Sequence, residues 1–378
     1  MSISKKSESE RISVIFPYLM GCLTVATVFL LLCLFVGYRI GRKDISNLYL
    51  KVFPVVHYKQ LLFLPEDVLE ELTELNAVIG NAGNPTNQPE HNTLAAIPDD
   101  ELTYVLRKDT KMFVSVLRTT KAYNFDPPVL VLKYADIDVI SARLKSYLRD
   151  QSRLIYSYST DHKGFRRTFP YIDSNEQVLI IGDSVAFGVG VDDELTAASY
   201  LQQMVSKRYE IVNAGVGGYD GQQAFLIAKK LSKKTKFAGL IYVACQNDFR
   251  TREDWIQEAN DVLAKIKSIS ERFNNNIIVM LHTYMEYNLR DIFLQNGWTD
   301  KRIQKTHELR RALPRISKKY GYEYSDWTEI VDEFMIRESS ILSRFALYAD
   351  HCHLSPLGNR LMAEKLLKIM EYKWQGKT

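Results

Sequence analysis

The segment Val178-Leu-Ile-Ile-Gly-Asp-Ser184 begins the most regular part of the chain. Its four apolar residues run directly into a glycine, an acid and a serine, as a buried strand does where it ends in a loop. Three more short β-branched runs follow, at 210–212, 239–243 and 277–281, with helical periodicity between them. Strands that alternate with helices are typical of parallel sheets. The sequence therefore predicts an α/β fold, a three-layer α/β/α sandwich around a parallel sheet.

The segments between and after these strands carry apolar residues at helical spacing, which predicts helices with one buried face. The three sets are Ala224, Ala228 and Leu231; Ile256, Ala259, Leu263 and Ile266; and Leu309, Leu313, Ile316 and Tyr320. Ser355-Pro356 predicts the start of a last helix, because serine caps helices and proline is favoured in the first turn.

Residues 44–156 precede this region and have a mixed pattern. They contain a helical stretch over 65–79, a Gly/Asn/Pro-rich loop over 81–98, a strand-like run over 129–132 and a helical run over 137–148. We expect this accessory segment to shape the cleft of a catalytic domain over 157–378 or to dock a partner.

Residues 12–38 contain no charged side chain. As a helix this run is about 40 Å long, enough to cross a bilayer with tilt. The sequence therefore predicts that residues 1–43 are a cytoplasmic tail and a single transmembrane anchor. Three basic residues precede the span and three follow it closely, so the charge rule for membrane orientation gives a tie.

Charge and composition exclude several classes of protein. The net charge of +4 is carried entirely by residues 1–43, which hold six basic and two acidic residues, so the rest of the chain is formally neutral. A nucleic-acid-binding domain would carry a basic stripe. Apolar residues make up 46% of the chain, too many for a disordered protein. We expect no disulfide framework, metal or cofactor.

Polar residues and glycines follow the ends of three consecutive predicted strands: Ser184, the turn Gly217-Gly218 and Asn247. Ligands of open parallel sheets bind beyond the carboxyl ends of the strands. Ahead of the last helix, Asp350 and His353 are three residues apart, which puts them on the same side of one turn.

These residues match the needs of acyl transfer, which are a nucleophile, a base, a carboxylate that orients the base and donors for the oxyanion. Ser184 would attack the acyl carbon, His353 would take its proton, and Asp350 would stabilise the imidazolium. The N–H groups of Ser184 and Gly218 and the side-chain amide of Asn247 would form the oxyanion hole. The sequence thus predicts a serine esterase or acyltransferase.

Four short segments carry these residues: Gly182-Asp-Ser184, Asn213–Tyr219, Cys245-Gln-Asn-Asp248 and Asp350–His353. In this order they resemble the four sequence blocks of the SGNH, or GDSL, hydrolase family, and the resemblance extends over residues 157–372. The resemblance implies a flavodoxin-like sandwich and the same roles for Ser184, Gly218, Asn247, Asp350 and His353. The segments Gly164-Phe-Arg and Gly188-Val-Gly-Val resemble bacterial members associated with the cell envelope. The catalytic domain is therefore expected outside the cytoplasm, in the periplasm.

One position departs from the family pattern. The third block usually has a glycine two residues before its aspartate, where this chain has Gln246. A side chain there would crowd the oxyanion hole or make its own contact with substrate. The aromatic residues that follow strand ends either line an acyl or sugar pocket or belong to the core; they are Phe187, Tyr219, Phe249 and Tyr284.

Two other histidines are weaker candidates for the base. His351 adjoins Asp350 instead of lying a turn away from it, and His282 ends a strand, as a core or rim histidine does.

The expected reaction is hydrolysis of an acyl ester, an O-acetyl group on an envelope carbohydrate. Two alternatives stay open. One is O-acyl transfer to a polysaccharide by the same residues, with the acyl donor supplied by partner proteins of the envelope polysaccharide machinery. The other is a non-catalytic scaffold of the same fold that binds glycans.

Overall fold

The computed structural model describes residues that all belong to one compact unit, Glu70–Thr378. They are residues 78–81, 96–117, 128–133, 152–205, 207–249, 254–288, 301–338, 346–350 and 352–374. The predicted membrane anchor over 12–38 and the predicted helix over 137–148 lie outside these ranges. Within them, no helix combines the length and the apolarity that a bilayer crossing requires.

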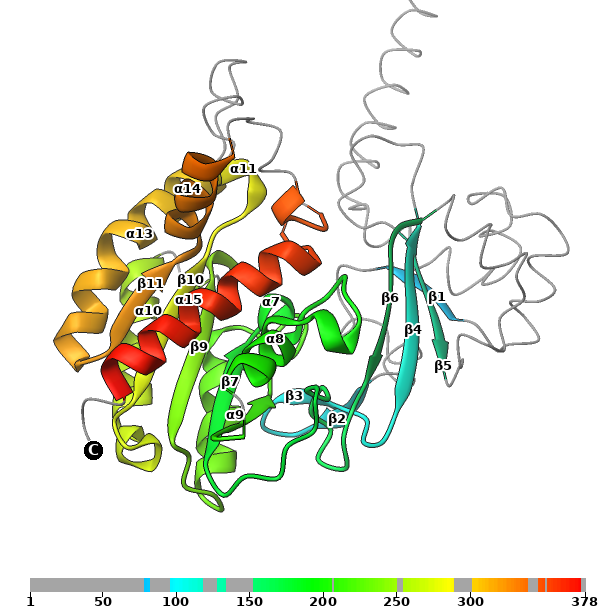
Figure 1. The fold of residues 1–378 in the computed structure, drawn as a ribbon, viewed down its shortest axis with the longest axis horizontal. Coiled ribbons are helices and arrows are strands. Elements are labelled where there is room, and N and C mark those ends of the chain that lie inside the picture. The colour runs from blue at the N-terminus through cyan, green and yellow to red at the C-terminus, as the bar shows by residue number, and fades with distance from the viewer. Residues whose placement is uncertain are drawn as a thin grey trace, which may run out of the picture. The chain divides into compact units, whose positions relative to one another are not determined.

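A five-stranded sheet with all neighbours parallel lies between the helices (Figure 1). Its strand order is β11-β10-β9-β7-β8. The strands are β7 (Gln177–Gly182), β8 (Glu210–Asn213), β9 (Gly239–Cys245), β10 (Ile277–His282) and β11 (Glu323–Asp326). The predicted parallel sheet is confirmed, and each of the four predicted strands lies within an observed one.

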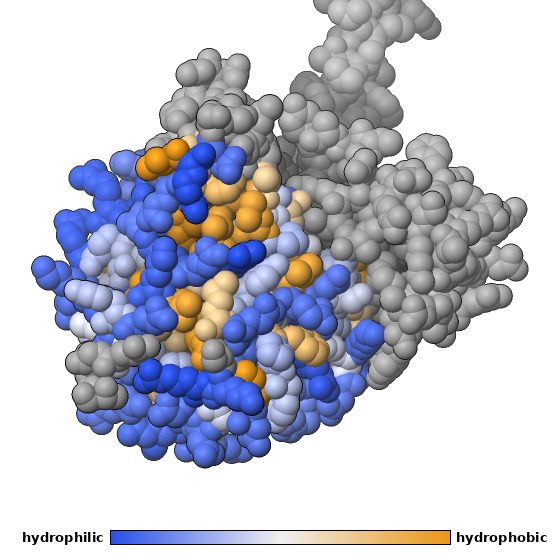
Figure 2. Space-filling view, viewed as in Figure 1, coloured by the Kyte–Doolittle hydropathy of each residue, from blue (hydrophilic) through white to orange (hydrophobic). Residues whose placement is uncertain are grey.

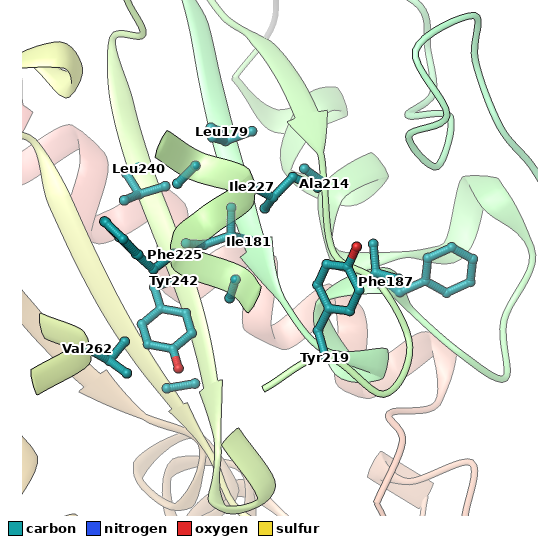
Figure 3. Close-up of a cluster of buried hydrophobic side chains, with 14 of the residues drawn as sticks. Leu179, Ile181, Phe187, Ala214, Tyr219, Phe225, Ile227, Leu240, Tyr242 and Val262 are labelled. Carbon is teal, nitrogen blue, oxygen red and sulfur yellow. The ribbon is translucent and has the colours of Figure 1, made fainter. Parts of the chain in front are cut away.

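The sheet is buried on both faces, and its strands show this by alternation. In β7, Leu179 and Ile181 enter one hydrophobic cluster, whereas Val178 and Ile180 enter a second cluster on the opposite face. Figure 3 shows part of the first cluster. Each fully buried side chain of this size stabilises the fold by about 1.5–3 kcal/mol. Because both of its faces are covered by helices, the inner strand β7 contains a continuous apolar run over Val178–Ile181.

Three helices pack on each face. The first cluster contains α9 (Gly221–Ser232), α10 (Trp255–Lys267) and α13 (Lys301–Tyr320), and the second contains α8 (Ala197–Met204), α14 (Trp327–Arg337) and α15 (Pro356–Trp374). The start of α15 is as predicted, because the Ser355 hydroxyl accepts a hydrogen bond from the Gly358 N–H at 3.2 Å. On the visible face, polar side chains cover most of the described surface and apolar ones form separate patches (Figure 2).

The accessory strands form a four-stranded antiparallel sheet and a hairpin. The sheet contains β1 (Val78–Asn81), β5 (Pro128–Lys133), β4 (Lys111–Leu117) and β6 (Ser152–Ser159), in this order. The hairpin pairs β2 (Ala96–Asp99) with β3 (Thr103–Leu106). Strand β5 confirms the run predicted over 129–132. The boundary predicted between residues 156 and 157 falls inside β6, so the accessory sheet extends to Ser159.

Three local predictions were wrong. Val78 and Ile79 belong to strand β1 and not to a helix, because they pair with β5 across the sheet. The loop predicted over 81–98 is strand at both ends, in β1 and β2. Ile256 is 36% exposed, because α10 turns Val262 into the core together with Ala259, Leu263 and Ile266.

Candidate active site

The nucleophile turn follows β7 directly. Gly182 has a φ of +145°, and a Cβ there would overlap the carbonyl oxygen of Val243, so only glycine fits this close approach between strands. Asp183 then caps the short helix α7 (Ser184–Phe187), and its Oδ1 accepts a hydrogen bond from the Val185 N–H at 2.9 Å. Ser184 is thereby held at the carboxyl edge of the sheet.

Ser184, His353 and Asp350 form one hydrogen-bonded chain. The Ser184 Oγ lies 2.9 Å from His353 Nε2, and His353 Nδ1 lies 2.8 Å from Asp350 Oδ2. A carboxylate only accepts, so Nδ1 carries a proton, and in the neutral ring Nε2 offers its lone pair to the serine hydroxyl. These are the geometry and the tautomer that a general base for Ser184 requires.

The loop before α15 fixes the imidazole from several sides. Asp350 Oδ1 accepts the N–H groups of Cys352 and His353, both at 2.8 Å. His282 Nε2 donates to the Cys352 carbonyl at 2.7 Å, so both ends of the peptide that joins Cys352 to His353 are held. Asp350 therefore positions the backbone of His353 as well as its ring.

His282 is fully buried, as expected of a core histidine. Burial lowers its pKa to about 3, which keeps the ring neutral, and its Nε2 proton is committed to the carbonyl of Cys352. His351 lies outside the described residues.

Two opposing effects act on the pKa of His353. Burial disfavours the imidazolium, whereas the sulfur of Cys352 and the charge and hydrogen bond of Asp350 favour it. The net result raises the pKa of His353 to about 9. The imidazolium that forms when Ser184 loses its proton is thus strongly stabilised.

The predicted oxyanion donors lie around the same turn. Asn247, in the turn η3 (Gln246–Phe249) after β9, donates from Nδ2 to Asp183 Oδ2 at 2.9 Å, beside the nucleophile. A Cβ on Gly217 would lie 3.8 Å from the Cβ of Ser184, so the glycine turn passes alongside the serine. Gly218 has a φ of +83°, in the left-handed region that favours glycine.

Gln246 is buried and its side chain is bonded to helix α13. Its side chain is 5% exposed, and its Oε1 accepts a hydrogen bond from the Thr306 hydroxyl of α13 at 2.5 Å. The side chain that replaces the family glycine is thus accommodated inside the protein by its bond to α13, and a contact of Gln246 with substrate stays a prediction.

Three of the four aromatic candidates are buried. Phe187 packs against Tyr158 and Arg166, the Tyr219 hydroxyl donates to the carbonyl of Tyr104 at 2.6 Å, and Phe249 is fully buried. Their burial favours the core alternative. Tyr284 is half-buried and the one aromatic of the four with appreciable exposure.

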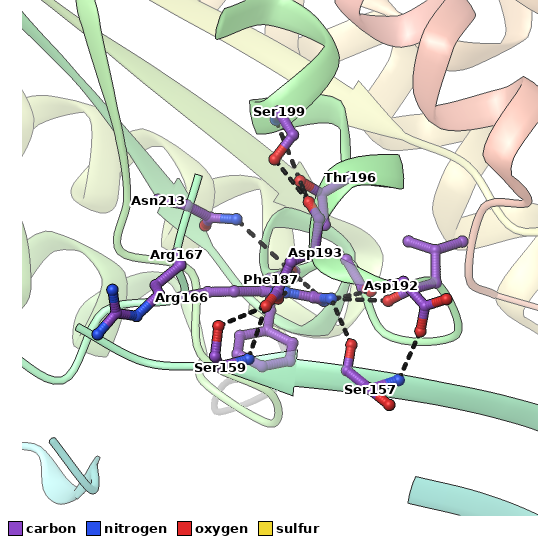
Figure 4. A network of polar contacts seen from close by, with 12 residues as sticks. Ser157, Ser159, Arg166, Arg167, Phe187, Asp192, Asp193, Thr196, Ser199 and Asn213 are labelled. Atoms are coloured by element: carbon purple, nitrogen blue, oxygen red, sulfur yellow. Dashed lines mark hydrogen bonds and ion pairs between the residues drawn. The ribbon is translucent and has the colours of Figure 1, made fainter. Parts of the chain in front are cut away.

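A buried arginine that sequence reasoning gave no role supports the turn after α7 (Figure 4). Arg166 Nε pairs with Asp193 at 2.9 Å, and its Nη1 and Nη2 donate to carbonyls at 2.6–2.9 Å. Those carbonyls belong to Phe187, Gly188 and Val191. The segment Gly164-Phe-Arg166 pointed to this site only as a resemblance, because bonds to main-chain carbonyls leave no pattern in the partner's sequence.

The region that contains the site matches a known protein family. Residues 180–361 match the model of the GDSL-like Lipase/Acylhydrolase family. No sequence among the curated proteins matches the chain.

Several solved structures resemble part of the chain. One is a member of the lipolytic protein G-D-S-L family from Veillonella parvula, with 15% identity over 52% of this chain and 98% of that one and a TM-score of 0.40. Another is an acetyl xylan esterase, with 16% identity over 51% and 98% and a TM-score of 0.41. A third is a carbohydrate acetylesterase family member from Sinorhizobium meliloti, with 11% identity over 52% and 98% and a TM-score of 0.40.

Proposed function

From the membership of residues 180–361 in the GDSL-like lipase and acylhydrolase family of serine ester hydrolases, we propose a function for the whole chain. The chain is a membrane-anchored enzyme that removes a short acyl group from an envelope carbohydrate. Its catalytic triad is Ser184, His353 and Asp350. The observation that carries the proposal is the distance of 2.9 Å between Ser184 Oγ and His353 Nε2.

The proposed reaction has two halves. Ser184 Oγ attacks the acyl carbon while its proton moves to His353 Nε2, and the carbonyl electrons move onto oxygen. The bond to the leaving alcohol then breaks, and His353 gives its proton to that alcohol. In the second half, water attacks the acyl carbon of the acyl-enzyme while its proton moves to His353 Nε2. The bond to Ser184 Oγ then breaks and His353 returns the proton to Ser184, which releases the free acid. Asp350 remains ionised throughout and stabilises the imidazolium.

The developing oxyanion needs donors near Ser184. We assign this role to the N–H groups of Ser184 and Gly218 and to the side-chain amide of Asn247. An amide has two N–H bonds, and the one that binds Asp183 fixes the plane of the group, so the direction of the other is set before substrate arrives. Such preorganised donors are worth roughly 10²–10³ in rate each.

Burial of the aromatic candidates supports a short acyl group. A long acyl chain needs an apolar tunnel, yet Phe187, Tyr219 and Phe249 are packed in the core of the described residues. An O-acetyl group needs little more than the oxyanion hole itself. The carbohydrate, the anchor over 12–38 and the periplasmic location rest on the sequence patterns and the resemblance to envelope-associated members.

The proposal is tested with the full chain purified in detergent. We expect turnover of p-nitrophenyl acetate well above that of p-nitrophenyl octanoate, release of free acetate from an acetylated oligosaccharide, and labelling by a fluorophosphonate probe. Ser184→Ala should abolish all three. Equal turnover by Ser184→Ala would refute the triad, and acetate that appears only on an added sugar acceptor would identify a transferase instead.

A further inference from the structure

The hairpin β2–β3 reaches the glycine turn of the site from outside the region that matches the family. Tyr104 of β3 is 4% exposed, and its hydroxyl donates a hydrogen bond to the carbonyl of Gly217. Tyr219, in the same turn, donates back to the carbonyl of Tyr104 at 2.6 Å, and the two rings meet edge to face with centroids 5.4 Å apart. The hairpin and the turn are therefore joined by two reciprocal bonds.

The bond to Gly217 acts on the proposed oxyanion donor through the peptide plane. The carbonyl of Gly217 and the N–H of Gly218 belong to one peptide group, and a trans peptide holds them in one plane on opposite sides. A partner that fixes the direction of the carbonyl therefore fixes the direction of the N–H. Because glycine is the most permissive residue on both sides of this plane, the chain itself supplies little restraint.

Tyr104 also shapes the space around this peptide. A Cβ on Gly218 would lie 2.9 Å from the Tyr104 hydroxyl oxygen. A side chain at position 218 would have to displace this hydroxyl, and the positive φ of Gly218 also favours glycine, at the position assigned to the oxyanion donor.

The hairpin itself is fixed to helix α9. Gln223 Nε2 donates to the carbonyl of Leu102 at 2.8 Å, and Lys230 Nζ pairs with Asp99 at 3.1 Å. Leu102, at the turn of the hairpin, is 1% exposed. Tyr104 is therefore held by a docked element and not by a free loop.

We propose that Tyr104 is a positioning residue of the active site, and that the accessory hairpin completes the oxyanion hole by orienting the Gly218 N–H. This inference rests on the proposed function. It assigns a role in the reaction to a segment that precedes residues 180–361 in the sequence.

The test is Tyr104→Phe, which keeps the ring and its packing on Tyr219 but removes the donor to Gly217. A misdirected oxyanion donor stabilises the transition state less and leaves the binding of the substrate in the ground state unchanged. We expect kcat for p-nitrophenyl acetate to fall by roughly tenfold or more with KM within about twofold of the wild type. The rate of phosphonylation of Ser184 should fall by the same factor.

Tyr322→Phe is the matched control. Tyr322 is also buried and donates to a main-chain carbonyl, that of Leu263 at 3.1 Å, but it precedes β11 at the opposite edge of the sheet. In thermal unfolding, the Tyr322→Phe protein should lose about as much stability as the Tyr104→Phe protein, while its kcat stays unchanged. A merely structural role for Tyr104 would make the two variants alike.

A second variant guards against a folding defect in the first. Lys230→Met removes the ion pair with Asp99 and loosens the hairpin with Tyr104 intact, so a smaller fall in kcat at constant KM is expected. Wild-type kcat in Tyr104→Phe, or equal changes in Tyr104→Phe and Tyr322→Phe, would overturn the inference. An inactive wild type, or an active Ser184→Ala, would instead refute the proposed function.

Discussion

His353 must be neutral to accept the proton of Ser184, and this requirement sets the pH dependence of the enzyme. Its pKa is raised to about 9, so below that pH the ring is mostly imidazolium and has no lone pair for the hydroxyl. At neutral pH the imidazolium therefore predominates over the neutral base. We expect kcat/KM for p-nitrophenyl acetate to rise about tenfold per pH unit up to about pH 9 and then to level off.

The measurement is a pH series from about 6 to 10, with the turnover of Ser184→Ala subtracted at each pH to remove spontaneous hydrolysis. A profile that levels off near pH 7 would show that the effects of Cys352 and Asp350 do not outweigh burial of the ring.

Asp350→Asn tests the tautomer. In the wild type, Oδ1 accepts two N–H groups of the backbone and Oδ2 faces His353 Nδ1. An asparagine that keeps the backbone bonds with its oxygen turns its NH₂ group toward Nδ1. That nitrogen must then lose its proton, and Nε2 gains one and can no longer accept from Ser184.

We expect kcat of Asp350→Asn to fall by roughly 10⁴. The loss of the charge and hydrogen bond that favour the imidazolium also moves the rise of the pH profile to lower pH. Asp332→Asn, which removes an exposed acid from α14, serves as the control and should behave as the wild type. A loss of less than tenfold in Asp350→Asn would contradict its role as the orienting carboxylate.

At the level of secondary structure, the sequence predicted elements well where burial on two faces produced an unmistakable pattern. Strands β7, β9 and β10 each contain a continuous run of at least four apolar residues, and the sequence predicted them. Strand β11 (Glu323–Asp326) reads Glu-Tyr-Ser-Asp, lacks that pattern, and exists because it pairs with the neighbouring strand β10. The helix predicted up to Ile79 was wrong for the same reason, since cross-strand pairing outweighs local preference.

The candidate site was predictable to the extent that its residues follow strand ends. Ser184, Asn247 and the Asp350/His353 pair are located by motif and spacing, and the structure brings them together. Arg166 and Tyr104 act on main-chain carbonyls, which every residue carries, so nothing in the partner's sequence identifies the contact. Gln246 could not be oriented without knowing that Thr306 of α13 packs over it.

The turn after α7 depends on one buried cation. Arg166→Met would leave Asp193 buried without its partner and would remove the donors to three carbonyls. Removal of one partner of a buried pair costs about 3–5 kcal/mol. We expect the urea midpoint of unfolding, followed by tryptophan fluorescence, to fall accordingly.

The double variant Arg166→Met/Asp193→Leu separates charge from packing. It removes both members of the pair, so it should be more stable than Arg166→Met alone. If Arg166→Met unfolds within about 1 kcal/mol of the wild type, the buried network does not hold this turn.

On the scale of the whole molecule, the parallel sheet explains why residues 169 positions apart meet. All five strands end at the same edge, so the loops after β7 and β9 and the loop before α15 converge there. The family match covers 180–361, yet two supports of the site, Arg166 and Tyr104, precede it. Tyr104 lies in the accessory segment, so that segment is tied to the catalytic core by contacts as well as by sequence.

The orientation of the chain in a membrane is the remaining large-scale prediction. The basic residues on the two sides of residues 12–38 balance, so they give no preferred direction, and the proposal of a periplasmic catalytic domain rests on the resemblance to envelope-associated members. Alkaline phosphatase needs disulfides and is active only outside the cytoplasm, whereas β-galactosidase is active only inside it. We expect a phosphatase fused after Thr378 of the full chain to be active in a bacterial host, and a galactosidase at the same position to be inactive. A charge-altered variant tests the same orientation independently. Replacing Arg39, Arg42 and Lys43 with glutamine should strengthen the result of the fusions, because it leaves the basic excess entirely on the N-terminal side.

The opposite pattern of reporter activities would place the catalytic domain in the cytoplasm. It would also exclude an envelope carbohydrate as the substrate.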